Sequence, residues 1–275
     1  MGLYKMGCHK KKCVENFEAI LNGKQEVPVN ESNGFGRVNV VLVDNKLKLS
    51  GYFQCLETEY DEAVGSHIHL GYAGATGAVV FELTPELDCD KLGGCYSECE
   101  NTFELTAEQV SDLKDRRFYV NIHTTGSPAG ELRGQILPDS HRYFIANLSG
   151  DNEVPPVVTT AFGTLVFELN KHNLTVSGSF DNLSSVLFPI NGSAAHIHFG
   201  PALTNGPVVF ALQVEADVDN LGGVVPAERN VFSLTCDQIK LLKDKDYYVN
   251  IHTVNNEDGE LRAQICKLKY VKATH

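Results

Sequence analysis

A histidine pair separated by one residue occurs twice in this sequence, and each pair is followed further along by a third histidine. In a β-strand, side chains two positions apart project from the same face at roughly 6.5–7 Å spacing, so each pair would direct two imidazoles together. Imidazole nitrogens are good ligands for copper, zinc and nickel. With the third histidine on a neighbouring strand, the pattern suits a copper or zinc site in each half of the chain. The candidate ligands are His67, His69 and His123 in the first half and His196, His198 and His252 in the second.

The neighbours of these histidines suit a purely structural cluster, which is the interpretation we prefer from the sequence. Strand alternation places Asn121 with His123 on one face, and Glu131 and Arg133 of the next segment would join them. A hydrogen-bonded patch of this kind would tie a hairpin to its neighbour strand and needs no cofactor. An arginine nearby also disfavours a bound cation through charge repulsion. In the second half Glu260 and Arg262 take the same places.

Other chemistry-bearing residues give no catalytic signature. Glu26 and Glu153 both stand in an E-V-P motif. A catalytic carboxylate would need a partner at a defined distance, so an ion pair or a cap is the preferred interpretation. The sequence holds no G-x-S-x-G, P-loop, G-x-G-x-x-G or H-E-x-x-H pattern. We therefore expect a protein that is not an enzyme.

An internal repeat organises the whole chain. SHIHLGYAGATGAVVFEL (66–83) returns as AHIHFGPALTNGPVVFAL (195–212), an offset of 129, whereas Glu26 and Glu153 are 127 apart. Two residues were therefore gained between the early and middle blocks of the second copy. We predict two domains, 16–138 and 141–269, joined by a short polar segment and preceded by a flexible, cysteine-containing tail of residues 1–15.

Within each copy the hydrophobic pattern alternates with period two, which is typical of strands. Two such runs meet at Asp44-Asn45, a hairpin turn signal. Thr106 and Thr235 each precede a glutamine by three residues, which predicts one capped short helix per copy. Many short strands with frequent glycine turns favour an all-β protein of two tandem antiparallel β-sandwiches.

Composition argues against nucleic acid and membranes as binding partners. Among 275 residues there are 23 Lys and Arg against 35 Asp and Glu, a formal charge of −12. Nucleic-acid binding needs a dense cationic surface, so we expect none. No apolar run approaches the roughly 20 residues that span a bilayer, and the N-terminal segment has no recognisable signal-peptide pattern. We expect no membrane insertion.

The repeated blocks resemble the CHRD domain, the repeat unit first defined in chordin. The matching motifs are L-x-G-x-x-E-V-P, A/S-H-I-H-x-G, Y-V-N-I-H-T and G-E-L-R, which recur in order and cover nearly all of both copies. The resemblance implies an immunoglobulin-sized β-sandwich, usually on extracellular or surface proteins, and no single established activity. The H-x-H strand is also loosely similar to that of copper–zinc superoxide dismutases.

Eight cysteines favour cross-linking. Three cluster in the first copy alone, and two lie in the tail, where an intersubunit bond is well placed. We therefore expect a structural protein of a spore or extracellular surface that assembles with itself or other surface proteins through sandwich contacts and disulfides. The disulfide candidates are Cys8, Cys13, Cys55, Cys89, Cys95, Cys99, Cys236 and Cys266.

Two alternatives stand beside the structural role. One is a metal-binding module that uses the two histidine triads, with a superoxide-dismutase-like activity as its extreme form. The other is an adhesion or ligand-binding module that uses glycine loops such as 71–77 as its contact surface. The structural role itself requires no cofactor.

Overall fold

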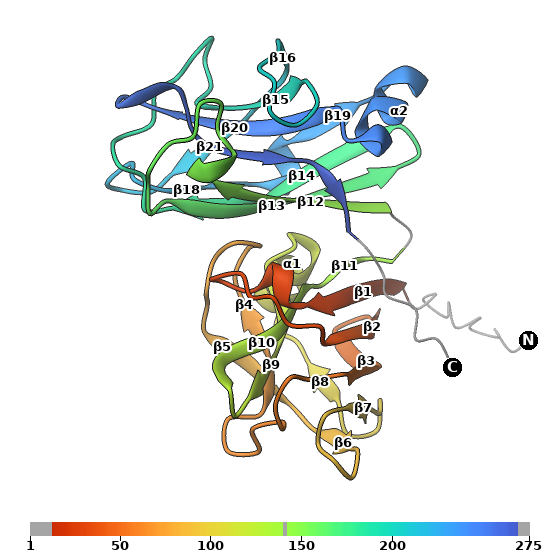
Figure 1. Ribbon diagram of the computed structural model, residues 1–275. Coiled ribbons are helices and arrows are strands. Elements are labelled where there is room, and N and C mark those ends of the chain that lie inside the picture. Colours follow the sequence, from red (N-terminus) through yellow and green to blue (C-terminus); the bar gives the residue numbers. More distant parts are fainter. Residues whose placement is uncertain (1–12, 140–141, 269–275) are drawn as a thin grey trace, which may run out of the picture.

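The computed structural model describes residues 13–139 and 142–268, and within these ranges the protein is all-β, with two antiparallel domains that each carry one short helix (Figure 1). This confirms the predicted fold class. The predicted tail lies largely outside the described residues, and the first strand already begins at Val14. Within the described ranges no helix is long and apolar enough to cross a membrane.

The two domains repeat one order of elements. The first contains β1 (Val14–Asn22), β2 (Phe35–Val43), β3 (Lys46–Gln54), β4 (Ser66–Leu70), β5 (Val79–Leu83), β6 (Pro85–Leu87), β7 (Gly94–Tyr96), β8 (Thr102–Glu104), α1 (Ala107–Lys114), β9 (Phe118–Thr124), β10 (Ser127–Gln135) and β11 (Leu137–Pro138). The second contains β12 (Arg142–Ser149), β13 (Phe162–Asn170), β14 (Asn173–Asp181), β15 (Ala195–Phe199), β16 (Val208–Leu212), β17 (Glu215–Ala216), β18 (Gly223–Val225), β19 (Val231–Ser233), α2 (Cys236–Asp244), β20 (Tyr247–Thr253), β21 (Asn256–Gln264) and β22 (Cys266–Lys267).

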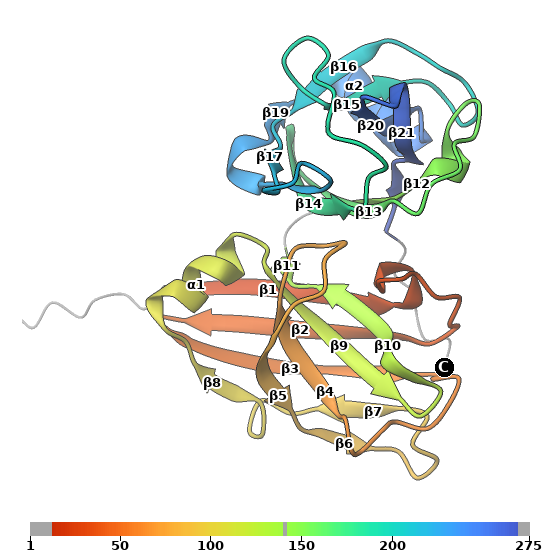
Figure 2. The same ribbon diagram turned by 90° about the vertical axis from the view of Figure 1, so that its left-hand side faces the viewer.

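Each domain is one continuous sheet that curls over itself. In the first domain the main path runs β5-β4-β9-β10-β1-β2-β3-β7-β6, and the second domain follows the same path. Figure 2 shows β4, β5, β9 and β10 of the first domain crossing over β1, β2 and β3. Alternate residues of β9, namely Phe118, Val120 and Ile122, are buried in the apolar core between these layers. The intervening residues of the same strand face away from this core.

The helices begin where the sequence predicts. Thr106 accepts a hydrogen bond from the backbone N–H of Gln109, and the Gln109 side chain accepts one from the Thr106 N–H. Thr235 and Gln238 form the same reciprocal pair at the start of α2. These bonds satisfy backbone groups that a helix start otherwise leaves unpaired.

The loop 71–77 packs against the second domain. The Ser179 hydroxyl donates to the Ala73 carbonyl at 2.9 Å, and Arg116 binds the Glu168 carboxylate through two nitrogens at 2.6 and 3.2 Å. Leu137 and Val166 belong to a small apolar cluster at the same joint. The tip of this loop, Ala73 and Gly74, is therefore covered by the protein's own second domain, and the expectation of an adhesion surface stays a prediction for other parts of the glycine loops.

Candidate metal centre

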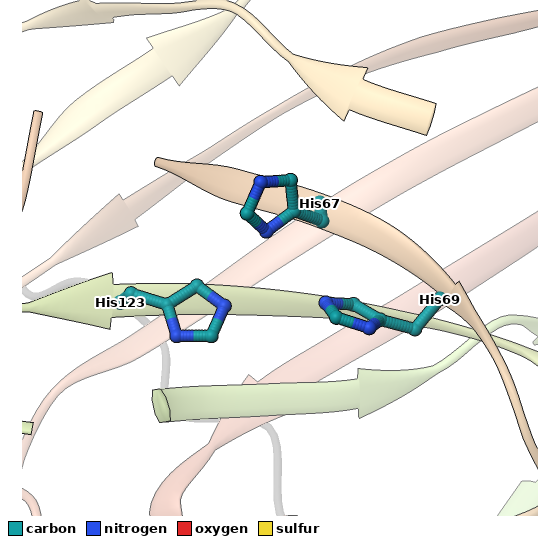
Figure 3. A group of neighbouring side chains, drawn as sticks. All are labelled: His67, His69 and His123. Carbon is teal, nitrogen blue, oxygen red and sulfur yellow. The ribbon is translucent and has the colours of Figure 1, made fainter. Parts of the chain in front are cut away.

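The three predicted histidines of each domain meet. Strand β4 lies beside β9, with His67 opposite Asn121 and His69 opposite Tyr119, so His123 stands two residues further along on the same face. One nitrogen of each of His67, His69 and His123 lies within 4.8 Å of the others, and Figure 3 shows the three rings facing a common point. His196, His198 and His252 form an equivalent triad on β15 and β20.

Backbone carbonyls orient two rings of the first triad. His69 Nδ1 lies 2.9 Å from the Gly77 carbonyl, and His123 Nδ1 lies 3.0 Å from the Pro128 carbonyl. A carbonyl can only accept, so each Nδ1 carries the proton and each Nε2 carries a lone pair. Both Nε2 atoms are buried without a protein partner, as is His67 Nδ1. The Nε2 lone pairs of His69 and His123 therefore converge with His67 Nδ1, and no protein group hydrogen-bonds any of these three nitrogens.

The second triad is oriented in the same way, with one addition. His198 Nδ1 and His252 Nδ1 each lie 2.9 Å from a carbonyl, those of Gly206 and Glu257. His196 Nε2 lies 3.1 Å from the Ile190 carbonyl, which leaves its buried Nδ1 unpartnered. Histidine ligands of metals commonly hold their other ring nitrogen in this manner.

Burial keeps the imidazoles neutral. Withdrawal from water disfavours the charged ring and lowers the pKa of all six histidines below the ordinary value, that of His252 to about 4. At neutral pH the triads therefore present lone pairs rather than positive charges. This is the protonation state that a metal ion requires.

A stacked tyrosine separates each triad from the nearby arginine. The His69 and Tyr119 rings stack at 5.0 Å, and the Arg133 guanidinium lies over Tyr119 at 3.5 Å from its centroid. Arg133 also donates to the Tyr72 carbonyl at 3.0 Å. The second domain repeats the stack with His198, Tyr248 and Arg262. The arginine therefore lies behind an aromatic ring and makes no direct contact with the imidazoles, although burial and, to a smaller extent, the arginine charge still lower the pKa of His69 and of His198.

The predicted polar patch also loses its glutamate. The Glu131 carboxylate accepts hydrogen bonds from Ser32, Thr124 and the backbone N–H of Glu57. Glu260 is held in the same way by Thr159, Ser184 and Thr253. Both glutamates tie loops to the sheet, so they neither pair with the arginines nor join the imidazoles.

Glu26 and Glu153 are buried below the E-V-P turns. Each closes a single helical turn through its backbone N–H, so the predicted capping role falls to the backbone. Burial raises the pKa of Glu26 to about 8, although the field of Arg133 opposes the shift, and burial raises the pKa of Glu153 to about 7. No second carboxylate pairs with either one at hydrogen-bonding distance among the described residues.

The described cysteines are all unpaired. Six are exposed and Cys266 is half-buried, whereas Cys8 lies outside the described residues. The predicted cross-links between copies stay a prediction. The exposed thiols are those of Cys13, Cys55, Cys89, Cys95, Cys99 and Cys236.

These observations define a class: a tandem antiparallel β protein with one buried histidine triad per domain. A scan of family models matches the CHRD domain twice, at residues 17–136 and 144–265. The chain therefore belongs to the CHRD domain family, as the sequence motifs indicated. A search of curated proteins finds no match to it.

Sequence reasoning missed the groups that orient the triads. Tyr119 and Tyr248 share the strand face of the histidines, and the period-two pattern that aligned Asn121 with His123 could have found them. The carbonyls of Gly77, Pro128 and Ile190 carry no side-chain signal, so only the folded backbone reveals them.

Proposed function

We propose that this protein binds one transition-metal ion in each domain through its histidine triad. The observation that carries the proposal is the convergence of three buried, unpartnered imidazole nitrogens in both copies. A structural cluster would pair such atoms, because a buried acceptor without a donor costs about 1–3 kcal/mol. Repeating that cost twice is difficult to explain without a ligand that the nitrogens share.

The donor set favours copper or zinc. Three neutral nitrogens suit these borderline ions and leave a further coordination position for a small molecule. A bound copper ion would supply one-electron chemistry, whereas zinc would supply Lewis acidity without redox change. The chain's own contribution is to hold the rings, exclude bulk water and keep Arg133 and Arg262 behind the tyrosines.

Metal content of the purified chain tests the proposal. After loading with Cu²⁺ or Zn²⁺ and dialysis, we expect two ions per chain by elemental analysis. His123→Ala should retain one ion, and the His123→Ala/His252→Ala double variant should retain none. His172→Ala is the matched control, because His172 is exposed and lies outside both triads. A wild-type chain that retains no more metal than the double variant would contradict the proposal.

A second candidate function is a structural, non-enzymatic role at an extracellular or spore surface. The six exposed thiols support it, because exposed cysteines can form disulfides between copies. We expect native material to run as disulfide-linked oligomers on non-reducing gels and to form fibres or sheets by electron microscopy. Only monomer on non-reducing gels, together with no fibres or sheets by electron microscopy, would exclude this role.

A further inference from the structure

The two triads differ in the loop that precedes their first histidine. In both domains the loop begins and ends with a hydrogen bond to the backbone of the third histidine. In the first domain the Asp61 N–H donates to the His123 carbonyl, and the His123 N–H donates to the Gly65 carbonyl. In the second domain the Phe188 N–H donates to the His252 carbonyl, and the His252 N–H donates to the Ala194 carbonyl. The two residues gained in the second copy must therefore lie between 188 and 194. They fall in the loop whose Ile190 carbonyl contacts His196.

In the second domain the longer loop folds back onto the triad. Asn191 and Gly192 both have positive φ, and Ile190 and Ser193 exchange two backbone hydrogen bonds across them. This tight turn brings the Ile190 carbonyl to His196 Nε2. All three rings of this triad are thus anchored to backbone carbonyls, and His196 is only 1% exposed.

In the first domain the shorter loop closes on itself. The Gly65 N–H donates to the Asp61 carbonyl, and the Asp61 side chain accepts from the Ala63 N–H. Among the described residues no group hydrogen-bonds His67 Nε2, so this ring is the one unanchored member of the two triads.

His67 also lines an open, acidic cavity. It is 9% exposed and forms part of the wall of a cavity of about 350 Å³, together with Glu62 and Glu82. Glu82 lies directly opposite His67 in the sheet, and the residue opposite His196 is Ala211. Two carboxylates therefore line the cavity that reaches His67, the one histidine of the triad in its wall, and they would attract a divalent cation there.

We propose that the two sites exchange metal at different rates: the first domain holds a labile site that loads and releases its ion through the acidic cavity, and the second holds a retentive site locked by the Ile190 carbonyl. This inference rests on the proposed metal-binding function. Outer partners of ligand histidines typically change metal affinity by 10–100-fold, so the missing anchor on His67 accounts for a difference of that order.

Single-site chains test the inference. His252→Ala leaves only the first-domain site, and His123→Ala leaves only the second. Each is loaded with Zn²⁺ and mixed with an excess of a chromogenic chelator, and release is followed by stopped-flow absorbance. We expect the His252→Ala chain to release zinc at least about tenfold faster than the His123→Ala chain. Equal rates, or the reverse order, would overturn the inference and leave metal binding intact, whereas two chains that bind no zinc would overturn both.

A reciprocal swap isolates the cavity without changing either loop. In the His252→Ala background, Glu82→Ala should slow zinc loading about threefold or more at low ionic strength, with little effect at high salt. In the His123→Ala background, Ala211→Glu should speed loading. A separate variant tests the loop itself: deletion of Asn191 and Gly192 in the His123→Ala background should raise the release rate toward that of the first-domain site. Circular dichroism establishes that each variant is folded, and a folded set with unchanged rates would contradict the proposal.

Discussion

A buried imidazole that donates its only N–H to a carbonyl must leave its other nitrogen as an acceptor. His69, His123, His198 and His252 are all in this state, and their acceptor nitrogens face other acceptors rather than donors. Two neighbouring lone pairs repel unless a proton or a cation lies between them. The low pKa of these rings disfavours the proton, and the metal ion proposed above would satisfy these lone pairs together.

The tyrosine beside each triad should support metal binding through its aromatic ring rather than through its hydroxyl. Tyr119 separates His69 from Arg133, so Tyr119→Leu removes both the stack and the aromatic layer before the guanidinium. We expect that variant to bind Cu²⁺ or Zn²⁺ at the first site about tenfold more weakly by calorimetric titration in a His252→Ala background. Tyr119→Phe keeps the ring and should bind within about twofold of the parent chain. Equal losses in both variants would assign the role to the hydroxyl, which accepts from the Gly77 N–H.

Glu26 should make stability depend on pH. Its pKa is about 8 in the folded protein and about 4.5 when unfolded, so the folded state holds the proton more tightly between these values. The sign follows from linkage: the contribution of Glu26 to stability is fully present below about pH 4.5 and is lost as pH rises toward 8. Glu26→Gln should therefore gain roughly 2 kcal/mol relative to wild type between pH 5 and pH 9, measured by urea unfolding. The exposed Glu86→Gln serves as control, and parallel curves for Glu26→Gln and wild type would refute the assignment.

At the scale of single elements, regular strands were predictable and their irregularities were not. Alternation alone placed His67 and His69 on one face, and β4 beside β9 then brought His123 to them. The same alternation failed for Glu131, because the register between β9 and β10 shifts between Ser127 and Leu132. A bulge of this kind redirects a side chain, and Gly130, whose φ is +131°, is the residue in the segment that signals it.

The helices illustrate the opposite case, in which a local motif was sufficient. The capping box depends only on residues three apart, so Thr235 and Gln238 predicted the start of α2 without knowledge of the fold. We expect Thr235→Ala to lower the free energy of unfolding by about 1 kcal/mol in urea titrations, because the Gln238 N–H loses its acceptor. Thr235→Ser keeps the hydroxyl and should stay within about 0.5 kcal/mol of wild type. A serine variant as unstable as the alanine one would show that the methyl group, not the cap, matters.

For the whole molecule, the two domains contact each other through residues that differ between the two repeats. Gly74 sits where an added Cβ would lie 2.6 Å from the Thr164 nitrogen and 2.7 Å from the Ser179 carbonyl oxygen. Thr164 and Ser179 are a directly opposed pair of small residues in β13 and β14. The loop tip therefore fits only because both surfaces are small, and the sequence repeat alone could not show which surfaces meet.

The same contact cannot be repeated from one copy of the chain to the next. At the position of Gly74 the second domain has Leu203, which is 78% exposed. The first domain carries Arg37 opposite Tyr52 where the second has its small pair, and Arg37 binds Glu18 at 2.6 Å. A head-to-tail stack would press a leucine onto two bulky side chains. Any assembly through exposed thiols must therefore use other surfaces, and this contact closes within a single chain.

Exchanging the two loop tips tests this account of the joint. In Gly74→Leu the new side chain meets backbone on the opposing sheet, and the position's φ of +86° adds strain, so the domains should separate. We expect a larger radius of gyration by small-angle X-ray scattering and faster amide exchange in β13, whose Thr164 N–H lies beneath the loop. Leu203→Gly alters only an exposed tip and should change neither measurement. An unchanged scattering profile for Gly74→Leu would contradict this account. The Arg116–Glu168 ion pair and the apolar cluster would then hold the domains together without the loop.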